Sequence, residues 1–348
     1  MTPTFYLETH CQDPAYNLAF EEYILTHFRE GNLLILWQNA PSVIIGRNQN
    51  TAEEVNSAFV DAHRIRVVRR NTGGGAVYHD LGNLNYSFIT DGNGLDKNTL
   101  QLFLVPVVQA LQNLGLDAQC SGRNDILVSG KKVSGTAQQL LRGRILHHGT
   151  LLFDADMNMI SGALNPDPTK FQSKSVKSVR SRVGNIRQAL SQDMNMQDFW
   201  AYLKNYLTQN LATALSLSEK DLTAIEALKK EKYDTWEWNY GKSPKCQLRC
   251  KKRWDGGLLD LQISLSQGRI SELHIFGDFL ALRPVAELEE ILIGCPYQSD
   301  ALKKALSSVP LNPYLGTVTA QELIETILNT DCAHPCKPIS NSEWRPVP

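Results

Sequence analysis

Residues 69–80 read Arg-Arg-Asn-Thr-Gly-Gly-Gly-Ala-Val-Tyr-His-Asp, and three successive glycines after two arginines are the most informative feature of this chain. Glycine has no Cβ and adopts positive φ readily, so the amides of such a loop can turn inward around phosphate or carboxylate oxygens. The guanidinium groups of Arg69 and Arg70 add charge that does not titrate away. A glycine run can also be a plain turn between strands. We interpret this one as a loop that binds an anionic ligand.

The loop matches neither of the common nucleotide-binding motifs. A P-loop has a lysine and a hydroxyl residue directly after its last glycine, and a Rossmann fingerprint has the spacing G-x-G-x-x-G. Here Ala76-Val77-Tyr78 follows the glycines instead. Gly241-Lys242-Ser243 ends like a P-loop, but the residue five positions before Gly241 is Trp236. The sequence therefore supports neither of these nucleotide-binding folds.

The segments on either side of the loop have the pattern of β-strands. Residues 65–69 lead into it with a mostly apolar run, and residues 84–89 follow it with alternating apolar and polar side chains. We therefore expect the loop to join two strands of one sheet. Further strands are expected at residues 33–37, 43–45, 126–128, 132–135 and 145–153, and helices at residues 17–28 and 99–114, the second with Pro106 as a kink.

The second half of the chain changes character twice. Residues 185–230 have helical spacing, residues 236–244 break it with aromatic and turn residues, and strands then alternate with short amphipathic stretches. We expect a protein of mixed α+β and α/β class. Its predicted parts are a large domain (residues 1–243), a small α/β accessory domain (residues 247–335) and a Pro-rich tail (residues 336–348).

Composition limits the classes of function. The chain has 348 residues, 42% of them hydrophobic, which is enough for two domains. A formal net charge of -1 gives no general argument for binding nucleic acid or an anionic membrane. The start of the chain lacks the pattern of a signal peptide, and no apolar run is long enough to span a bilayer. Seven cysteines, an odd number, favour reduced thiols. We expect a cytoplasmic enzyme.

A second segment with chemical potential contains Asp125 and Lys132, separated by a turn near Gly130. Two strands joined at this turn would hold the carboxylate and the ammonium group close together. A fixed lysine between a carboxylate and a phosphate can stabilise the negative charge that develops in acyl-phosphate chemistry. The alternative is a plain hairpin with solvated lysines.

A third segment, residues 174–183, places four cations among serines without any acidic residue. Such a stretch is commonly a solvated face, but it can also form a loop that orders over a polyphosphate.

These segments together resemble the lipoate-protein ligase family, the bacterial type with a C-terminal accessory domain. The resemblance is carried in order by residues 69–80, 121–125, 132–137, 147–150, 178–185 and 236–241. It implies a large mixed-sheet catalytic domain related to biotin ligases and class II tRNA synthetases. It also implies a monomer that uses ATP and Mg²⁺ to activate lipoate or octanoate as the acyl-AMP. The acyl group then passes to a lysine of lipoyl domains, in the E2 subunits of 2-oxoacid dehydrogenases and in the glycine cleavage H protein.

The resemblance also implies roles for individual residues. Lys132 would be catalytic and would touch both the phosphate and the lipoyl carbonyl, and Asp125 would orient Mg²⁺. The nucleotide would contact Arg70, Gly75, Ala76, Val77, Tyr78 and Lys132. Lipoate would contact Gly74, Gly75, Val77, Lys132 and His148, and Ser178, Arg180 and Arg182 would belong to a loop that covers the adenylate.

Other readings of the sequence remain open. The chain could be a transferase that takes lipoyl or octanoyl groups from preformed lipoyl-AMP or from a carrier thioester, or it could bind lipoate without catalysis. A thioester mechanism favours a nucleophilic cysteine, and the catalytic part contains Cys11 and Cys120. We expect no structural zinc, although Cys246, Cys250, Cys332, His334 and Cys336 have spacings that could bind it.

Overall fold

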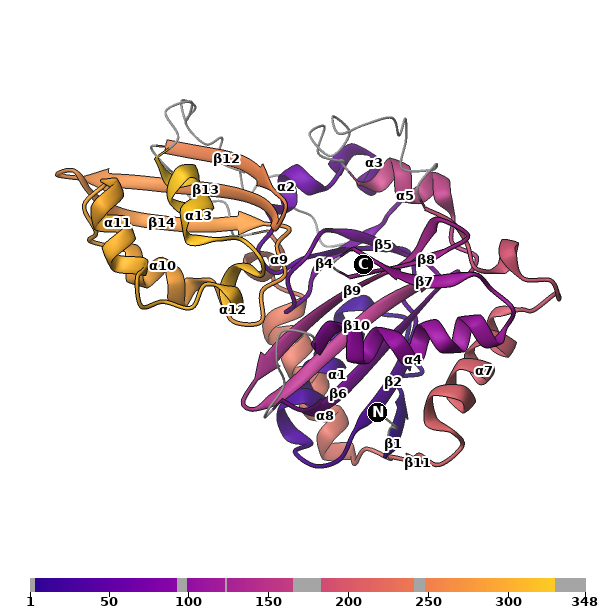
Figure 1. The fold of residues 1–348 in the computed structure, drawn as a ribbon. Helices are drawn as coiled ribbons and strands as arrows, with labels where there is room; N and C mark the ends of the chain where they lie inside the picture. Colours follow the sequence, from indigo (N-terminus) through magenta and orange to yellow (C-terminus); the bar gives the residue numbers. More distant parts are fainter. Residues whose placement is uncertain (1–3, 93–98, 123, 165–182, 241–247, 329–348) are drawn as a thin grey trace. The chain divides into compact units, whose positions relative to one another are not determined.

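The computed structural model describes residues 4–92, 99–122, 124–164, 183–240 and 248–328 (Figure 1). The chain forms two compact units. Unit 1 contains residues 1–44, 56–68 and 77–235, and unit 2 contains residues 45–55, 69–76 and 236–348. The glycine loop therefore belongs to the same compact unit as the C-terminal part of the chain. The domain boundary predicted between residues 243 and 247 and the predicted tail lie outside the described residues.

Unit 1 is built on an eight-stranded sheet with the order β11-β1-β2-β6-β10-β9-β8-β7. Strand β1 pairs in parallel with β2 and β11, and the other pairs are antiparallel. This is the large mixed sheet that the sequence predicts. The strands are β1 (Phe5–Glu8), β2 (Leu33–Trp37), β6 (Asn83–Asp91), β7 (Ala118–Ser121), β8 (Asp125–Val128), β9 (Lys131–Leu141), β10 (Arg144–Leu152) and β11 (Thr213–Ala214).

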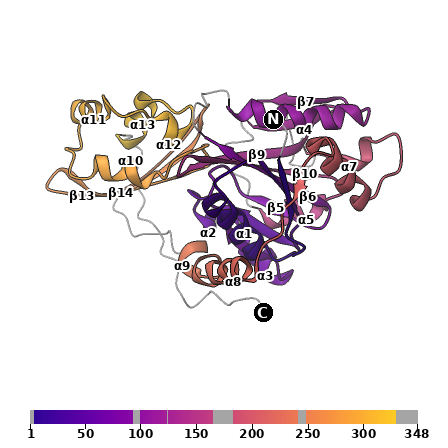
Figure 2. The same cartoon turned by 90° about the horizontal axis from the view of Figure 1, so that it is seen from below.

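Helices cover both faces of this sheet (Figure 2). Helices α4 (Thr99–Asn113) and α7 (Met196–Thr208) lie on one face, and α1 (Pro14–His27), with α8 (Glu219–Leu228) packed against it, lies on the other. The shorter elements of the unit are α3 (Ser57–Ala62), α5 (Met157–Ala163), η2 (Arg187–Ala189) and η3 (Lys229–Tyr233).

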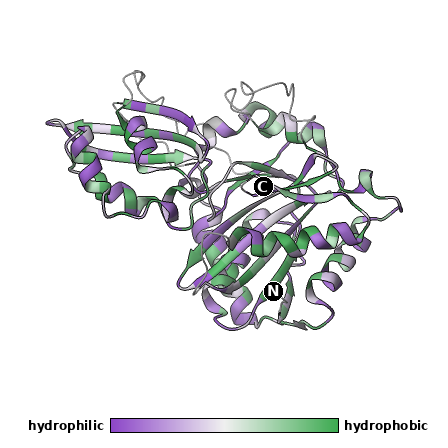
Figure 3. Cartoon of the chain, in the orientation of Figure 1, coloured by the Kyte–Doolittle hydropathy of each residue, from purple (hydrophilic) through white to green (hydrophobic). Residues whose placement is uncertain are grey.

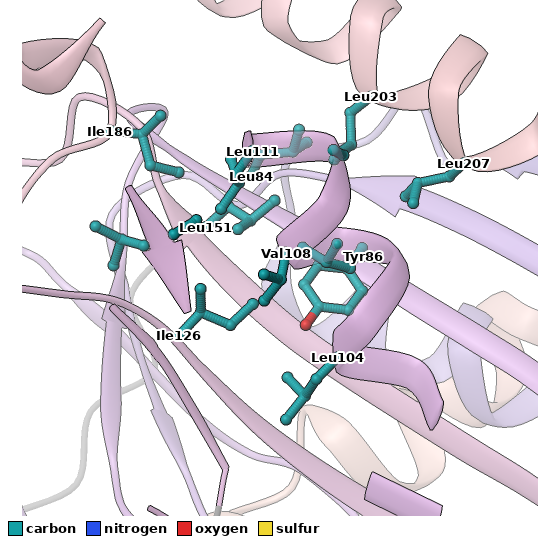
Figure 4. Close-up of a cluster of buried hydrophobic side chains, with 14 of the residues drawn as sticks. Leu84, Tyr86, Leu104, Val108, Leu111, Ile126, Leu151, Ile186, Leu203 and Leu207 are labelled. Carbon is teal, nitrogen blue, oxygen red and sulfur yellow. The ribbon is translucent and has the colours of Figure 1, made fainter. Parts of the chain in front are cut away.

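The hydrophobic core of unit 1 lies between the sheet and helices α4 and α7 (Figure 4). Helix α4 has no charged residue and is largely hydrophobic (Figure 3), and it continues past Pro106. From the sheet, Leu84, Tyr86 and Leu151 point into this core. Burial of one such leucine stabilises the fold by about 1.5–3 kcal/mol. This face of the sheet therefore contributes to the hydrophobic core and thereby to stability.

Helix α1 is fixed at its start by local chemistry. The Asp13 carboxylate accepts a hydrogen bond from the Ala15 amide at 2.9 Å, and Pro14 occupies the first turn. An acidic N-cap and an early proline are typical of helix N-termini. On the side of α8, the Tyr23 hydroxyl donates to Asp221 at 2.7 Å. These contacts fix the helix that supplies Glu21 to the second face of the sheet.

A smaller sheet has the order β4-β3-β5 and consists of β3 (Ser42–Ile45), β4 (Arg66–Arg69) and β5 (Val77–His79). The glycine loop joins β4 to β5 within this sheet. The expectation that it leads directly into the strand at residues 84–89 is therefore wrong, because that strand is β6 of the large sheet. The short strand β5 escapes sequence analysis because three residues are too few to show a period.

Unit 2 contains a three-stranded antiparallel sheet, β12-β13-β14, packed against short helices around a second hydrophobic core. Its elements confirm the expected small accessory fold with strands and helices. Their bounds are α2 (Thr51–Glu54), α9 (Trp236–Asn239), β12 (Leu248–Trp254), β13 (Gly257–Ser266), β14 (Arg269–Gly277), α10 (Ala286–Leu292), α11 (Ser299–Leu306), α12 (Asn312–Leu315) and α13 (Ala320–Ile327).

Candidate active site

A row of residues crosses five strands on the face of the large sheet that α1 covers. Trp37 of β2 pairs in register with Asn85 of β6, and Asn85 pairs with Thr150 of β10. The Gly135 amide of β9 donates to the Thr150 hydroxyl at 3.3 Å, and Gly135 pairs with Asp125 of β8. The pairing thus aligns residues that are far apart in the sequence.

Lys132 stands over this row. Its ammonium group forms an ion pair with Asp125 at 2.7 Å, and the two side chains are 40% and 31% exposed. The β8–β9 turn at Ser129 and Gly130, both with positive φ, brings them together as the sequence predicts. A Cβ at Gly135 would lie 3.3 Å from the Lys132 Nζ, so the glycine leaves room for the ammonium group above the sheet.

The chain returns to Lys132 after residues 165–182, which lie outside the described residues together with the predicted loop residues Ser178, Arg180 and Arg182. Val183 forms an isolated parallel bridge with Lys132, and the Gly184 amide donates to the Lys132 carbonyl at 3.0 Å. Val183 and Gly184, which follow the predicted loop in the sequence, are therefore anchored at the backbone of Lys132.

A buried polar network lies beside the row, and the sequence analysis missed its centre, Glu21. Both Glu21 carboxylate oxygens lie 2.9 Å from His148 Nδ1, and one accepts a hydrogen bond from the Ser87 hydroxyl at 2.6 Å. Trp37 Nε1 donates to the same hydroxyl at 2.9 Å. Glu21 thereby fixes His148 and orients the serine that holds Trp37. The sequence offered one indication of this role, namely an acidic residue among the apolar residues of α1.

His147 points to the opposite face of the sheet from His148, as the alternation along a strand predicts. It is fully buried and stacks on Phe103 with ring centroids 4.9 Å apart. Burial, with a smaller effect of His148, holds the pKa of His147 well below its usual value. The ring is neutral at pH 7, and the two histidines cannot share a metal ion.

Val77 and Tyr78 belong to β5, where they pair with Ile44 and Val43. Tyr78 is buried, and burial together with the nearby Asp80 raises its pKa to about 12. The phenol is therefore protonated at physiological pH. Val77 is half-buried.

In unit 2, Arg69 is a structural residue. Its side chain is 0% exposed, and its guanidinium donates to the carbonyl groups of Trp238, Gly46, Arg47, Gln49 and Asn239 and to the Thr51 hydroxyl. Burial, with a smaller effect of Arg70, lowers the pKa of Arg69 to about 10, so it remains charged at pH 7. The expectation that both arginines offer charge to a ligand is wrong for Arg69.

The Arg70 side chain forms hydrogen bonds with several residues of the glycine loop. Its Nε donates to the Thr72 hydroxyl at 2.9 Å, and one terminal nitrogen donates to the carbonyls of Gly73 and Gly75 at 2.6 and 2.9 Å. The guanidinium of Arg70 thereby holds two carbonyl groups of the loop in place. Its predicted contact with the nucleotide stays a prediction.

The three glycines of the loop have different reasons to be glycine. Gly74 has φ +89°, a conformation that favours glycine, and a Cβ at Gly73 would lie 2.7 Å from the Phe279 carbonyl oxygen. At Gly75, by contrast, a Cβ would meet no heavy atom within 4 Å among the residues described. Packing and conformation explain Gly73 and Gly74 but not Gly75, so the predicted ligand contact at Gly75 stays a prediction that the open space allows.

Comparison with known proteins places the chain in a family. Residues 13–208 match the family model of the lipoyl protein ligase A/B catalytic domain, and residues 243–327 match the bacterial lipoate protein ligase C-terminus. The chain belongs to the lipoate-protein ligase family. Among its relatives, lipoate-protein ligase LplJ of Bacillus subtilis is 43% identical over 320 residues, which cover 90% of this chain and 97% of the relative. Lipoate–protein ligase 1 of Staphylococcus aureus is 41% identical, with 92% and 98% covered.

Solved structures agree. The P. falciparum LipL1 structure with lipoate has a TM-score of 0.77 and 26% identity, and the match covers 93% of this chain and 99% of that one. A lipoate-protein ligase A bound with ATP has a TM-score of 0.61 and 31% identity, covering 69% and 99%. The family, the fold and the lipoate-protein ligase activity predicted from the sequence are thereby confirmed.

Two further observations bear on the ligase. Its described residues contain no group of three His, Cys, Asp or Glu side chains placed to hold a metal ion, and none of its described helices is long and apolar enough to cross a bilayer. Among the described cysteines, Cys11, Cys120 and Cys295 are free, and the expectation of reduced thiols is wrong for Cys250, which is disulfide-bonded.

The different roles of the loop glycines can be tested by two alanine substitutions. Gly73→Ala is expected to destabilise the protein by about 1–3 kcal/mol, because its Cβ would press on backbone that cannot move freely. Gly75→Ala is expected to change stability by less than about 0.5 kcal/mol but to lower kcat/KM, because its Cβ would occupy the ligand's space. Urea unfolding and lipoylation rates measure the two effects. Normal lipoylation by Gly75→Ala would contradict this assignment.

Proposed function

We propose that the ligase uses ATP to form lipoyl-AMP and that Lys132 is the residue on which both half-reactions depend. The observation that carries this proposal is the Lys132 ammonium group, which lies 2.7 Å from the Asp125 carboxylate and above Gly135, on a side chain that is 40% exposed to solvent. A related ligase was solved bound with ATP, which supports the choice of nucleotide. The proposed acid substrate is lipoate, and octanoate is the alternative.

In the first half-reaction, a carboxylate oxygen of lipoate attacks the α-phosphorus of ATP, and the bond to pyrophosphate breaks. Two anions must approach each other, so a fixed cation lowers the barrier more than a covalent nucleophile would. The ammonium group of Lys132 stabilises the charge on the pentacoordinate phosphorus.

In the second half-reaction, the amine of the acceptor lysine attacks the acyl carbonyl and AMP leaves. The carbonyl oxygen becomes negatively charged in the tetrahedral intermediate. Lys132 donates to this oxygen as well as to the phosphate, which is why one residue serves both steps.

Asp125 is the residue proposed to orient Mg²⁺. A single, partly exposed carboxylate fits this ion, because Mg²⁺ commonly binds one or two carboxylates and takes its other ligands from water and substrate phosphates. When bound, Mg²⁺ neutralises phosphate charge. The same carboxylate pairs with the Lys132 ammonium group and positions it.

The glycine loop is proposed to bind the ligands through Gly74, Gly75 and Ala76, continuing into Val77 and Tyr78. The open space at Gly75 supports this role. Arg70 contributes by shaping the loop and by its charge. His148, fixed by Glu21, is proposed to contact the acyl chain of lipoate.

The proposed adenylate-covering loop contains Ser178, Arg180 and Arg182. Its return to the Lys132 backbone through Val183 supports this assignment. Ordering of such a loop over the intermediate would exclude water and protect lipoyl-AMP from hydrolysis.

The proposed acceptors are lipoyl domains of E2 subunits and the glycine cleavage H protein, with the ligase acting as a cytoplasmic monomer. An archaeal ligase 32% identical to this chain was solved in a study of that ligase and its E2 lipoyl domain, which supports the first kind of acceptor. Neither nucleic acid nor a membrane has a part in this reaction.

The second candidate function is a lipoyl or octanoyl transferase that uses preformed lipoyl-AMP or a carrier thioester, and one observation counts against the thioester route. Burial raises the pKa of the Cys120 thiol, which disfavours the reactive thiolate.

The Lys132 assignment predicts the outcome of lipoate-dependent ATP–pyrophosphate exchange without an acceptor. Lys132→Ala is expected to lower exchange by about 10²–10³-fold while remaining folded, and also to lose transfer from supplied lipoyl-AMP. Lys220→Ala is the control, because this exposed lysine of α8 lies outside the row. Exchange at the normal rate in Lys132→Ala would overturn the assignment. Absent exchange in the unsubstituted protein, with transfer intact, would make the protein a transferase.

A further inference from the structure

Two buried amides on the active face leave hydrogen-bonding groups without partners. Asn83 and Asn85 are 0% and 1% exposed. With their amides oriented as assigned, Asn83 Nδ2 donates to Asn85 Oδ1 at 2.9 Å, and the pair lies on adjacent outward positions of β6. Asn85 Nδ2 and Asn83 Oδ1 then have no hydrogen-bond partner among the described residues. A buried amide donor without a partner is costly, so such a group commonly serves a ligand or an ordered water.

The position of Asn85 relates it to the acyl chain. Asn85 lies two strands from Gly135, over which the Lys132 ammonium group stands, and this separation is about 10 Å at normal strand spacing. His148 lies one step along the same face, because it pairs with Ser87. A medium-chain acid whose carboxylate is held by Lys132 and whose tail reaches toward His148 therefore passes Asn85 near its far end.

The chemistry of that far end differs between the two acids considered. Lipoate carries a dithiolane ring, whose sulfur atoms are weak hydrogen-bond acceptors, whereas octanoate ends in an alkyl chain that accepts nothing. When an alkyl chain displaces water from Asn85, the amide N–H loses its partner. When the dithiolane displaces the same water, a ring sulfur accepts a weak hydrogen bond from the amide N–H and so replaces part of the lost hydrogen-bond energy.

We propose that Asn85 is a specificity-determining residue that donates a hydrogen bond from Nδ2 to a dithiolane sulfur, so that the enzyme favours lipoate over octanoate. Asn83 positions it by occupying its Oδ1 and thereby directing Nδ2 toward the ligand. Thr150 and Trp37, the neighbours of Asn85 in the row, border the same place. This inference rests on the proposed function, in which Lys132 holds the carboxylate.

The test compares kcat/KM for lipoate and octanoate in ATP–pyrophosphate exchange. Asn85→Ala and Asn85→Leu both remove the donor, and the leucine keeps a similar side-chain volume. Each variant is expected to lower the ratio of lipoate to octanoate by about five- to tenfold, through a lower value for lipoate and an unchanged or higher value for octanoate. Asn113→Ala is the control, because this exposed asparagine of α4 lies outside the row, and it should leave the ratio unchanged.

The outcomes separate the inference from the proposed function. Equal losses with both acids, and so an unchanged ratio, would show that Asn85 acts only in structure and would overturn the inference. An unchanged ratio with unchanged rates would mean that the amides bind only water, and would overturn it as well. If the unsubstituted protein shows no exchange with either acid, the proposed adenylation fails. In that case the same ratio is measured for transfer from supplied lipoyl-AMP and octanoyl-AMP, so Asn85 remains testable.

Discussion

The register of strands β2, β6, β10, β9 and β8 is the constraint on which the active face depends. It aligns Trp37, Asn85, Thr150, Gly135 and Asp125, and the Lys132 ammonium group stands over this row. Because side chains alternate across a sheet, a slip of one residue would turn each of these groups into the opposite face. The core under α4 and α7 prevents this slip, since it would expose Leu84, Tyr86 and Leu151. Hydrophobic packing on one face therefore fixes the chemistry on the other.

A second constraint concerns how the ligand loop is supported. The Gly74 amide donates to the Phe279 carbonyl at 3.1 Å, and the Gly277 amide donates to the Asn48 carbonyl at 2.7 Å. Arg69 adds hydrogen bonds to Trp238 and Asn239. Residues early in the sequence are thus built into the unit that contains the C-terminal sheet. The C-terminal part of unit 2 therefore helps to set the conformation of the glycine loop, which carries predicted ligand contacts.

Much of this could be predicted from the sequence, for identifiable physical reasons. Long apolar periods predicted helix α4 and the strands of the large sheet, and the turn at Gly130 predicted that Asp125 and Lys132 meet. Charge alone misled the interpretation of Arg69, because a sequence does not show whether a guanidinium faces a ligand or backbone carbonyls. Glu21 and Asn85 escaped because their roles arise from register and helix packing between distant segments. Sequence spacing within one segment cannot supply that information.

A crystal structure with a non-hydrolysable analogue of lipoyl-AMP would test the central claim most directly. The account predicts that the Lys132 Nζ lies within hydrogen-bond distance, about 3 Å, of both the phosphate and the acyl carbonyl oxygen, with the acyl chain crossing β10 toward Asn85 and His148. An analogue whose phosphate and carbonyl are held by other groups, with Lys132 still paired only with Asp125, would contradict it.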